Sequence, residues 1–236
     1  MKISVFDNDD GVALAAARMI AAEARRAVAE RGIFTFAVSG GKTPWTMLKD
    51  LASEDLPWLK VHLFQIDERI APIGDSDRNL THLYESFRTV EGETPLPLEN
   101  IHPMPVNLND PMEGAKEYEQ TIRKLCGTPP VLDLAHLGLG PDGHTASLVP
   151  GDAVLDVVGR DVALTGVYQG RRRMTLTFEM INRSRMILWL ATGEAKVPMI
   201  ARLQRADQSI PAGKIIQENA FLLTDTAAAA GLQSVP

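Results

Sequence analysis

The segment that most limits how this chain can fold is Leu137–Gly151, LGLGPDGHTASLVPG, which directly follows the apolar run Val131–His136. The run predicts a buried strand, and the glycines behind it allow backbone turns and close approach to a ligand. Asp142 and His144 would then lie on a loop at the carboxyl end of a strand, where open α/β sheets bind their ligands. A loop imidazole suits proton transfer at neutral pH. For this loop alone, an N-capping aspartate and a backbone-bonded histidine explain the residues equally well.

A glycine turn follows a second apolar run, Ile33–Val38, and leads into a segment with helical spacing. The turn has the sequence SGGKTP, in which Thr43 suits the N-cap of the helix and Pro44 its first turn. Backbone N–H groups and the helix dipole at such a turn form an anion site that fits phosphate. The motif matches neither a Walker loop nor the dinucleotide GxGxxG pattern, and similar turns also occur for packing reasons alone.

Two further strands are followed by charged residues. Val61–Ile66 leads into DER, which ends at Arg69, and Met186–Ala191 leads into TGEAK, which ends at Lys196. A surface ion-pair cluster and a solvated lysine are the simple explanations. Arg69 would nevertheless lie at the same sheet edge as the SGGKTP turn, and a guanidinium matches phosphate oxygens. Lys196 in the first turn of a helix opposes the helix dipole, so a nearby anion would stabilise it.

The order of these segments predicts a single domain, residues 1–236, with a three-layer α/β fold. A largely parallel sheet would lie between helices, and the second half would add some antiparallel strands, because 161–168 and 173–178 favour a hairpin or a locally antiparallel edge. Residues 90–110 are expected to form an ordered connection. Further strands are expected at 2–6, 33–38, 61–66, 101–104, 131–136, 186–191 and 220–223, and helices at 8–31, 44–52, 81–89, 111–125, 179–183, 193–205 and 224–230.

Composition argues against several classes of protein. A chain of 236 residues, 45% hydrophobic and with a net charge of −6, can form a substantial core and is a poor partner for nucleic acid. No apolar run approaches the roughly 18 residues of a membrane helix, and the N-terminus lacks the apolar region of a signal peptide. We therefore expect no membrane association and a cytoplasmic location. The single cysteine, Cys126, predicts neither an internal disulfide nor a structural metal site.

Five motifs occur in one order along nearly the whole chain: SGGKTP, DERIAP with a later Asn79, LGLGPDGHTASLVPG, RMTLT and TGEAK. In this order they resemble the motifs of 6-phosphogluconolactonases, and the GPDGHTAS segment is the most specific of them. The resemblance implies a sugar-phosphate isomerase-like fold. It also implies hydrolysis of a phosphorylated sugar lactone, 6-phospho-D-glucono-1,5-lactone, to 6-phosphogluconate in the oxidative pentose phosphate pathway, without metal or organic cofactor.

The resemblance implies roles at both ends of such a substrate. His144 would transfer the proton of the attacking water, and Asp67 would orient water or substrate. The phosphate would be bound by the glycine turn, by Arg69 and Lys196, and by Arg173 as a weaker candidate. A serine nucleophile is disfavoured, because the GxSxG elbow is absent. The implied substrate-binding residues are Ser39, Gly40, Gly41, Thr43, Arg69, Asp142, Gly143, Arg173 and Lys196.

Two other functions stay open on the sequence. Glucosamine-6-phosphate deaminases are similar in fold and phosphate turn, but they carry an acidic residue where this chain has Val149. A non-catalytic sugar-phosphate-binding regulator would keep the pocket without turnover, and the presence of Asp67, His144 and Lys196 argues against it. A transient contact with the upstream dehydrogenase that forms the lactone is also left open, since no dedicated docking segment is visible.

The chain departs from the family pattern in two places. Arg78 stands where the family usually has serine before Asn79, and Gln169–Arg172 replaces a proline-rich approach to RMTLT. We expect both departures at the rim of the pocket. Whether Arg171 or Arg172 joins in binding phosphate stays open.

Overall fold

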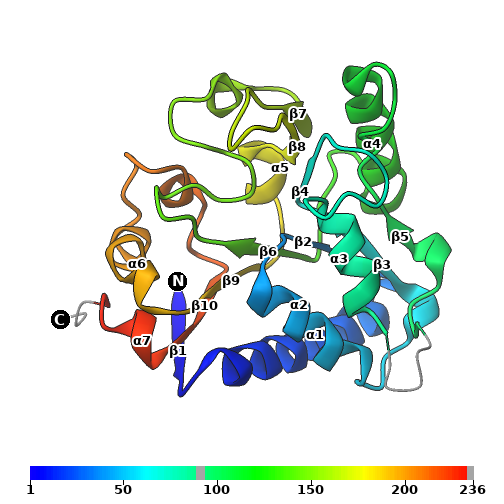
Figure 1. Ribbon diagram of the computed structural model, residues 1–236. Coiled ribbons are helices and arrows are strands. Elements are labelled where there is room, and N and C mark those ends of the chain that lie inside the picture. Colours follow the sequence, from blue (N-terminus) through cyan, green and yellow to red (C-terminus); the bar gives the residue numbers. More distant parts are fainter. Residues whose placement is uncertain (89–93, 233–236) are drawn as a thin grey trace.

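The chain forms a seven-stranded sheet and a separate three-stranded sheet in the computed structural model, which describes residues 1–88 and 94–232. All neighbouring strands of the large sheet are parallel. Figure 1 shows this sheet crossing the molecule with helices on both sides, which confirms the predicted three-layer α/β fold. Its strands, in spatial order, are β1 (Lys2–Phe6), β10 (Ala220–Asp225), β9 (Ile187–Ala191), β6 (Leu134–Gly138), β2 (Phe34–Val38), β3 (Val61–Gln65) and β5 (Ile101–His102).

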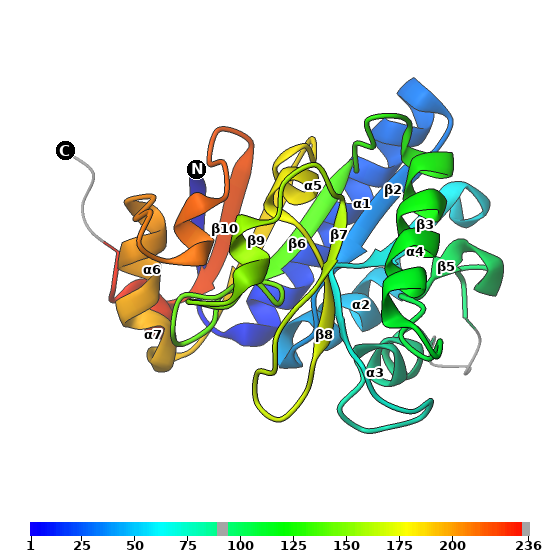
Figure 2. The same ribbon diagram turned by 90° about the horizontal axis from the view of Figure 1, so that it is seen from above.

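The order of the strands reverses between β2 and β6. From β2 the chain moves outward to β3 and β5, whereas from β6 it moves in the other direction to β9 and β10. The connections that leave the carboxyl ends of β2 and β6 therefore diverge, and a crevice forms between them. Figure 2 shows β2 and β6 side by side near the middle of the sheet.

Side chains of the central strands divide the core in two, because successive residues of a strand point to opposite faces. In β9, Leu188 and Leu190 pack on one face, whereas Ile187 and the fully buried Trp189 pack on the other. The first face is covered by α1 (Asp9–Arg31), α2 (Lys42–Ala52) and α3 (Asn79–Ser86). The second is covered by the small sheet and by α4 (Pro111–Cys126), α5 (Phe178–Asn182), α6 (Val197–Gln204) and α7 (Thr226–Ala229).

The boundaries of α1 follow from its sequence. The Asn8 side chain accepts the backbone N–H of Gly11 at 2.9 Å and caps the helix, which carries two acidic residues in its first turn. Gly32 ends the helix in the left-handed conformation, with φ of 77°, and its N–H donates to the Val28 carbonyl. Alanines on the inner face of α1 are fully buried, which lets the helix lie close to the sheet.

The small sheet is antiparallel and has the order β4 (Asp67–Arg69), β8 (Arg173–Leu176), β7 (Val162–Leu164). The β7–β8 pair confirms the predicted hairpin in a shorter form. The sequence did not predict β4, because its charged residues were interpreted as the end of the preceding strand. The pairing places Asp67 opposite Thr175 and Arg69 opposite Arg173. It thereby brings the DER and RMTLT motifs together.

Several boundaries differ from the predictions. Strand β6 begins at Leu134, since the Asp133 side chain accepts the backbone N–H of Thr35 in place of a regular ladder bond. Lys196 ends a short 3-10 turn directly before α6 and is not inside that helix. The predicted end of the 81–89 helix and the start of the 90–110 connection fall on 89–93, outside the described residues. Within the described part of the chain, none of the helices is both long and apolar enough to span a membrane.

Gly11, in the first turn of α1, and Gly32, which follows its last residue, should respond oppositely to substitution by alanine. Gly32→Ala should lower the free energy of unfolding by about 1 kcal/mol, because a Cβ is disfavoured in the left-handed conformation. Gly11→Ala should leave the free energy unchanged or raise it by up to about 1 kcal/mol, since a Cβ there meets Phe6 only at 3.4 Å. Urea unfolding checks both variants, and equal losses would contradict the conformational explanation.

Candidate active site

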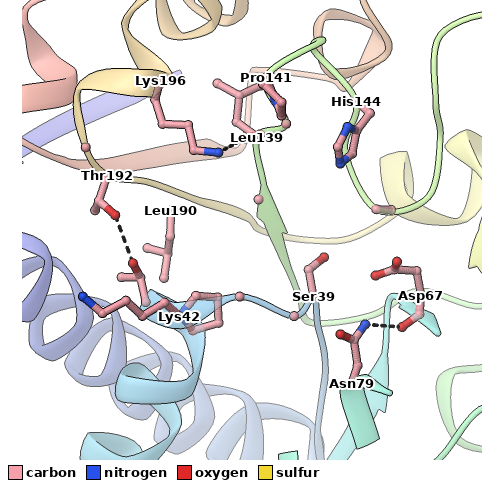
Figure 3. Close-up of a pocket in the computed structure, with 18 of the residues that line it drawn as sticks. Ser39, Lys42, Asp67, Asn79, Leu139, Pro141, His144, Leu190, Thr192 and Lys196 are labelled. Carbon is pink, nitrogen blue, oxygen red and sulfur yellow. Dashed lines mark hydrogen bonds between the residues drawn. The ribbon is translucent and has the colours of Figure 1, made fainter. Parts of the chain in front are cut away.

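A cavity of about 650 Å³ opens at the carboxyl ends of the central strands. It is lined by the segments that follow β2, β3, β6 and β9, and thus occupies the crevice where the strand order reverses. The four loops singled out from the sequence meet here (Figure 3). The predicted site residues that line the cavity are Ser39, Gly40, Gly41, Thr43, Asp67, Arg69, His144, Arg173 and Lys196.

The SGGKTP turn forms one wall of the cavity. Helix α2 begins at Lys42 with Gly41 as its N-cap, so the predicted N-cap role of Thr43 is wrong. None of the described side chains caps this helix, and its first N–H groups are therefore available to an anion. The Thr43 hydroxyl instead contacts the Thr192 hydroxyl at 3.0 Å.

The first amide of the turn is already occupied by a buried histidine. The Ser39 N–H donates to Nδ1 of His136 at 3.2 Å. Burial lowers the pKa of His136 to about 3, so its ring is neutral and Nδ1 accepts this bond at physiological pH. An anion at this turn would therefore meet the amides that follow, beginning at Gly40. The Ser39 hydroxyl is buried and has no partner among the described residues.

Asn79 connects the turn to the end of β3. Its Nδ2 donates to the Asp67 carbonyl at 2.9 Å, and its Oδ1 accepts from Nη1 of Arg69 at 2.5 Å. Gly40 packs directly against this amide, since a Cβ at Gly40 would lie 2.1 Å from Asn79 Oδ1. The glycine is thus needed for close approach, and the contact holds Arg69 beside the turn.

Asp67 and Arg173 are joined through Ser147. The Ser147 hydroxyl donates to Oδ2 of Asp67 at 2.6 Å, and Nη1 of Arg173 lies 3.5 Å from the same hydroxyl. Arg173 is buried, and its Nε has no partner among the described residues. Burial lowers the pKa of Arg173, although the nearby Asp67 carboxylate acts to raise it. This wall of the cavity therefore presents a carboxylate and a guanidinium that are both shielded from bulk water.

His144 points into the cavity from the opposite side (Figure 3). Its Nδ1 lies 2.5 Å from Oδ1 of Asp142, which also accepts the His144 backbone N–H at 3.1 Å. Burial acts to raise the pKa of Asp142, but the hydrogen bonds with His144 hold the pKa below its ordinary value. An ionised Asp142 accepts the Nδ1 proton, so Nε2 is the basic nitrogen of the neutral ring. Among the described residues, none donates to or accepts from Nε2.

Two lysines line another part of the cavity, close to Thr192 (Figure 3). Nζ of Lys196 donates to the Leu139 carbonyl at 2.5 Å, and burial lowers the pKa of this lysine. A bound anion would stabilise the charged form of Lys196. Lys42 is exposed and pairs with Asp9 at 3.0 Å. Lys42 was not among the predicted site residues.

Asp142 and Gly143, predicted to bind substrate, are not among the residues that line the cavity. Asp142 contacts the ring of His144 instead. Gly143 has φ of +81° and packs against Ile210, where a Cβ would lie 2.6 Å from Ile210 Cβ. Gly140 is equally constrained, because a Cβ there would lie 2.1 Å from Nδ1 of His144. These residues shape the loop that carries His144.

The predicted rim position of Arg78 is wrong. Its side chain is only 2% exposed, with Nε 3.4 Å from Oε2 of the fully buried Glu68. Arg171 and Arg172 do not line the cavity either. Arg171 forms ion pairs with two aspartates of the 70–79 loop, and Nε of Arg172 donates to the Thr165 carbonyl. The departures from the family pattern thus alter loop packing around the cavity rather than its lining.

Five polar or charged side chains line the cavity although the sequence had suggested no role for them: Asp9, Lys42, Asn79, Thr192 and Asp225. Asp225 accepts the Gly193 N–H with both carboxylate oxygens, each at 3.0 Å. Asp225 lies two residues after the predicted strand 220–223, and this position could have identified it as a candidate site residue. The described residues contain no group of three or more His, Cys, Asp or Glu side chains that could hold a metal ion.

Known proteins resemble this chain in sequence and in fold. Residues 7–224 match the family model of glucosamine-6-phosphate isomerases/6-phosphogluconolactonase. The 6-phosphogluconolactonase of Synechocystis sp. is 39% identical over 175 residues, which cover 72% of this chain and 71% of that protein. The GDH/6PGL endoplasmic bifunctional protein of Homo sapiens is 33% identical over 219 residues, which cover 86% of this chain and 27% of that protein. The solved 6-phosphogluconolactonase of Thermotoga maritima superposes with a TM-score of 0.82 at 25% identity, covering 95% of this chain and 98% of that one.

The buried Glu68 should be a strong determinant of stability. It accepts the backbone N–H groups of Asn79 and Leu80 at 2.8 and 2.9 Å and is the carboxylate partner of Arg78. Glu68→Gln would leave the Arg78 charge buried without a carboxylate and should lower the free energy of unfolding by about 3–5 kcal/mol. Urea unfolding checks this. Glu85→Gln, at a side chain 71% exposed, is the matched control and should change the free energy by less than about 0.5 kcal/mol.

Proposed function

The chain belongs to the family of glucosamine-6-phosphate isomerases and 6-phosphogluconolactonases, and we propose that it hydrolyses 6-phospho-D-glucono-1,5-lactone to 6-phosphogluconate. One observation carries this proposal. His144 points into the cavity with Nδ1 on Asp142 and with Nε2 unbonded among the described residues, opposite a carboxylate and within the same cavity as a glycine turn and four cationic side chains. Such an arrangement suits proton transfer to and from a phosphorylated substrate.

In this proposal the phosphate binds at the SGGKTP turn. The amides that begin at Gly40 donate hydrogen bonds, and the dipole of α2 favours the negative charge. Arg69 and Lys196 supply positive charge. Lys196 supports this assignment because burial disfavours its charged form until an anion is near. The Thr43 and Thr192 hydroxyls lie beside the same turn and can orient the phosphate oxygens.

The lactone lies at the other end, between His144 and Asp67. Nε2 of His144 takes a proton from water as the water oxygen attacks the lactone carbonyl carbon. The bond between that carbon and the ring oxygen then breaks, and His144 returns the proton to the ring oxygen, which leaves as a hydroxyl group. Asp142 stabilises the imidazolium that exists between the two transfers. The steps use water and side chains of the chain alone.

Asp67 and Arg173 complete this mechanism. Asp67 accepts a hydrogen bond from Ser147 with Oδ2, so its carboxylate has a fixed orientation from which to direct the attacking water. Nε of Arg173, in the same wall, has no partner within the described part of the chain. We assign Arg173 to the lactone end, where a buried guanidinium stabilises the negative charge that develops on the carbonyl oxygen.

A deaminase function has less support. Val149, at the position where the deaminases carry an acidic residue, is an aliphatic side chain with 7% exposure and cannot transfer a proton.

The name of the bifunctional relative combines GDH with 6PGL, which supports a functional connection with a dehydrogenase that forms the lactone. We propose that any such contact is transient.

Removal of the imidazole should abolish most of the catalysis. His144→Ala should lower kcat by roughly 100-fold or more with little change in KM, since a positioned acid–base group contributes about that much. Acid release from freshly generated 6-phosphogluconolactone, corrected for spontaneous hydrolysis, measures this. His82→Ala, at a partly exposed histidine outside the cavity lining, should retain full activity.

The same assay separates the competing functions when ammonia release from glucosamine-6-phosphate is measured in parallel. Hydrolysis by the wild type at the spontaneous rate would defeat the lactonase proposal. Ammonia release would then favour a deaminase, and inactivity in both assays would favour a binding role.

Loss of Arg69 should weaken binding of the phosphorylated lactone far more than binding of the unphosphorylated one. Arg69→Ala should raise KM for the phosphorylated lactone by roughly 10- to 100-fold, the equivalent of a charge-assisted hydrogen bond of about 1.5–3 kcal/mol. The kcat/KM value for unphosphorylated glucono-1,5-lactone should change little. Arg25→Ala, on the exposed side of α1, is the matched control. Equal losses on both lactones would assign Arg69 a structural role.

A further inference from the structure

Tyr168 lies between the two halves of the candidate active site. Its hydroxyl donates to Oδ2 of Asp142 at 3.2 Å, on the oxygen that His144 does not use. Its ring meets the His144 ring edge-on, with the centroids 5.4 Å apart. The guanidinium carbon of Arg173 lies over the same Tyr168 ring, 5.1 Å from its centroid. One side chain thus contacts groups that belong to both catalytic walls.

Tyr168 does not itself line the cavity. It can therefore influence the reaction only through the residues that it contacts. Burial and the neighbouring Asp142 carboxylate raise the pKa of Tyr168. Its hydroxyl is consequently protonated at neutral pH and acts as a hydrogen-bond donor.

The hairpin between β7 and β8 fixes the position of this tyrosine. Tyr168 and Arg171 exchange backbone hydrogen bonds at 2.9 and 3.2 Å around Gln169 and Gly170, whose φ values of 51° and 77° are those of a tight type I′ turn. The Gln169 side chain accepts from Nη2 of Arg173 at 3.1 Å. The turn residues Gln169–Arg172, which directly follow Tyr168, are the segment that departs from the family pattern.

The far end of the turn is anchored as well. Arg171 pairs with Asp75 at 2.9 Å and with Asp77 at 3.2 Å, both on the loop between β4 and α3. The carbonyl of Asp77 also accepts from Nη1 of Arg69. The hairpin is therefore held at both ends, and the direction of the Tyr168 side chain is set by the backbone rather than by a bound ligand.

We propose that Tyr168 is a positioning residue for the hydrolysis, which fixes the Asp142–His144 pair and Arg173 without contacting the substrate. The proposal rests on the lactonase function proposed above. The Asp142 carboxylate uses Oδ1 for two N–H groups of His144 and Oδ2 for the tyrosine hydroxyl. Without that hydroxyl the carboxylate can rotate, and the imidazole that it orients spends less time with Nε2 directed at the attacking water.

The split between kcat and KM tests this role. Tyr168→Phe, which keeps the ring, should lower kcat by about tenfold, the rate equivalent of a weak hydrogen bond to an ionised carboxylate, and leave KM unchanged. Tyr168→Leu also loses the ring contacts and should lower kcat further at the same KM. Tyr84→Phe, at a tyrosine 38% exposed on α3, is the matched control and should keep both constants. An unchanged kcat in Tyr168→Phe, or a loss confined to KM, would overturn the proposal.

A second readout needs no turnover. The 15N resonances of the His144 ring in the substrate-free protein report which nitrogen carries the proton. We expect the Nδ1–H tautomer in the wild type and in Tyr84→Phe, and a mixture of tautomers in Tyr168→Phe. Identical His144 spectra in the wild type and Tyr168→Phe would overturn the positioning role, whereas a wild type that does not exceed spontaneous lactone hydrolysis would overturn the proposed function instead.

Discussion

The reversal of strand order between β2 and β6 is the constraint on which the rest of the site depends. Parallel strands place their carboxyl ends at one edge, and the reversal directs the connections after β2 and β6 to opposite faces of the sheet. The edge between them cannot be covered by either connection. The segments that follow β2, β3, β6 and β9 at this edge contribute to the wall of the cavity. The fold therefore creates the crevice before any particular side chain gives it a chemistry.

Buried polar groups then determine where the side chains lie in this crevice. A carboxylate as buried as Glu68 is unfavourable unless it is hydrogen-bonded, and it accepts from the backbone N–H groups of Asn79 and Leu80 at the start of α3. These bonds bring the Asn79 amide against Gly40 and next to Arg69. A group with no place in the proposed chemistry thus fixes the position of the cation next to the glycine turn. In a similar way, the Tyr168 hydroxyl on the β7–β8 hairpin contacts Asp142, and Asp142 in turn contacts the ring of His144.

Recognition of an anion by a chain with a net charge of −6 has to be local. The cavity meets this requirement by burial. Lys196 and Arg173 both have pKa values lowered by loss of hydration, so each gains from a negative charge on the ligand. The acidic side chains of the cavity are occupied by other partners: Asp225 accepts the Gly193 amide, and Asp67 accepts the Ser147 hydroxyl. The cationic side chains are therefore available to a ligand, whereas the Asp67 and Asp225 carboxylates already accept hydrogen bonds from groups of the protein.

The sequence by itself determined the layers of the fold and the loops that carry Ser39, Asp67, His144 and Lys196. Apolar periodicity and turn residues are local properties, and parallel strands bring their carboxyl ends to one edge without further information. The tertiary structure alone decided that Asp67 and Arg69 pair with the RMTLT strand, that Arg78 is buried on Glu68, and that Asp225 joins the cavity. The physical reason is distance along the chain. The pairing of Arg69 with Arg173 and the contact of Tyr168 with Asp142 depend on packing between segments that are far apart in the sequence. The local sequence of one such segment does not indicate which other segment it contacts.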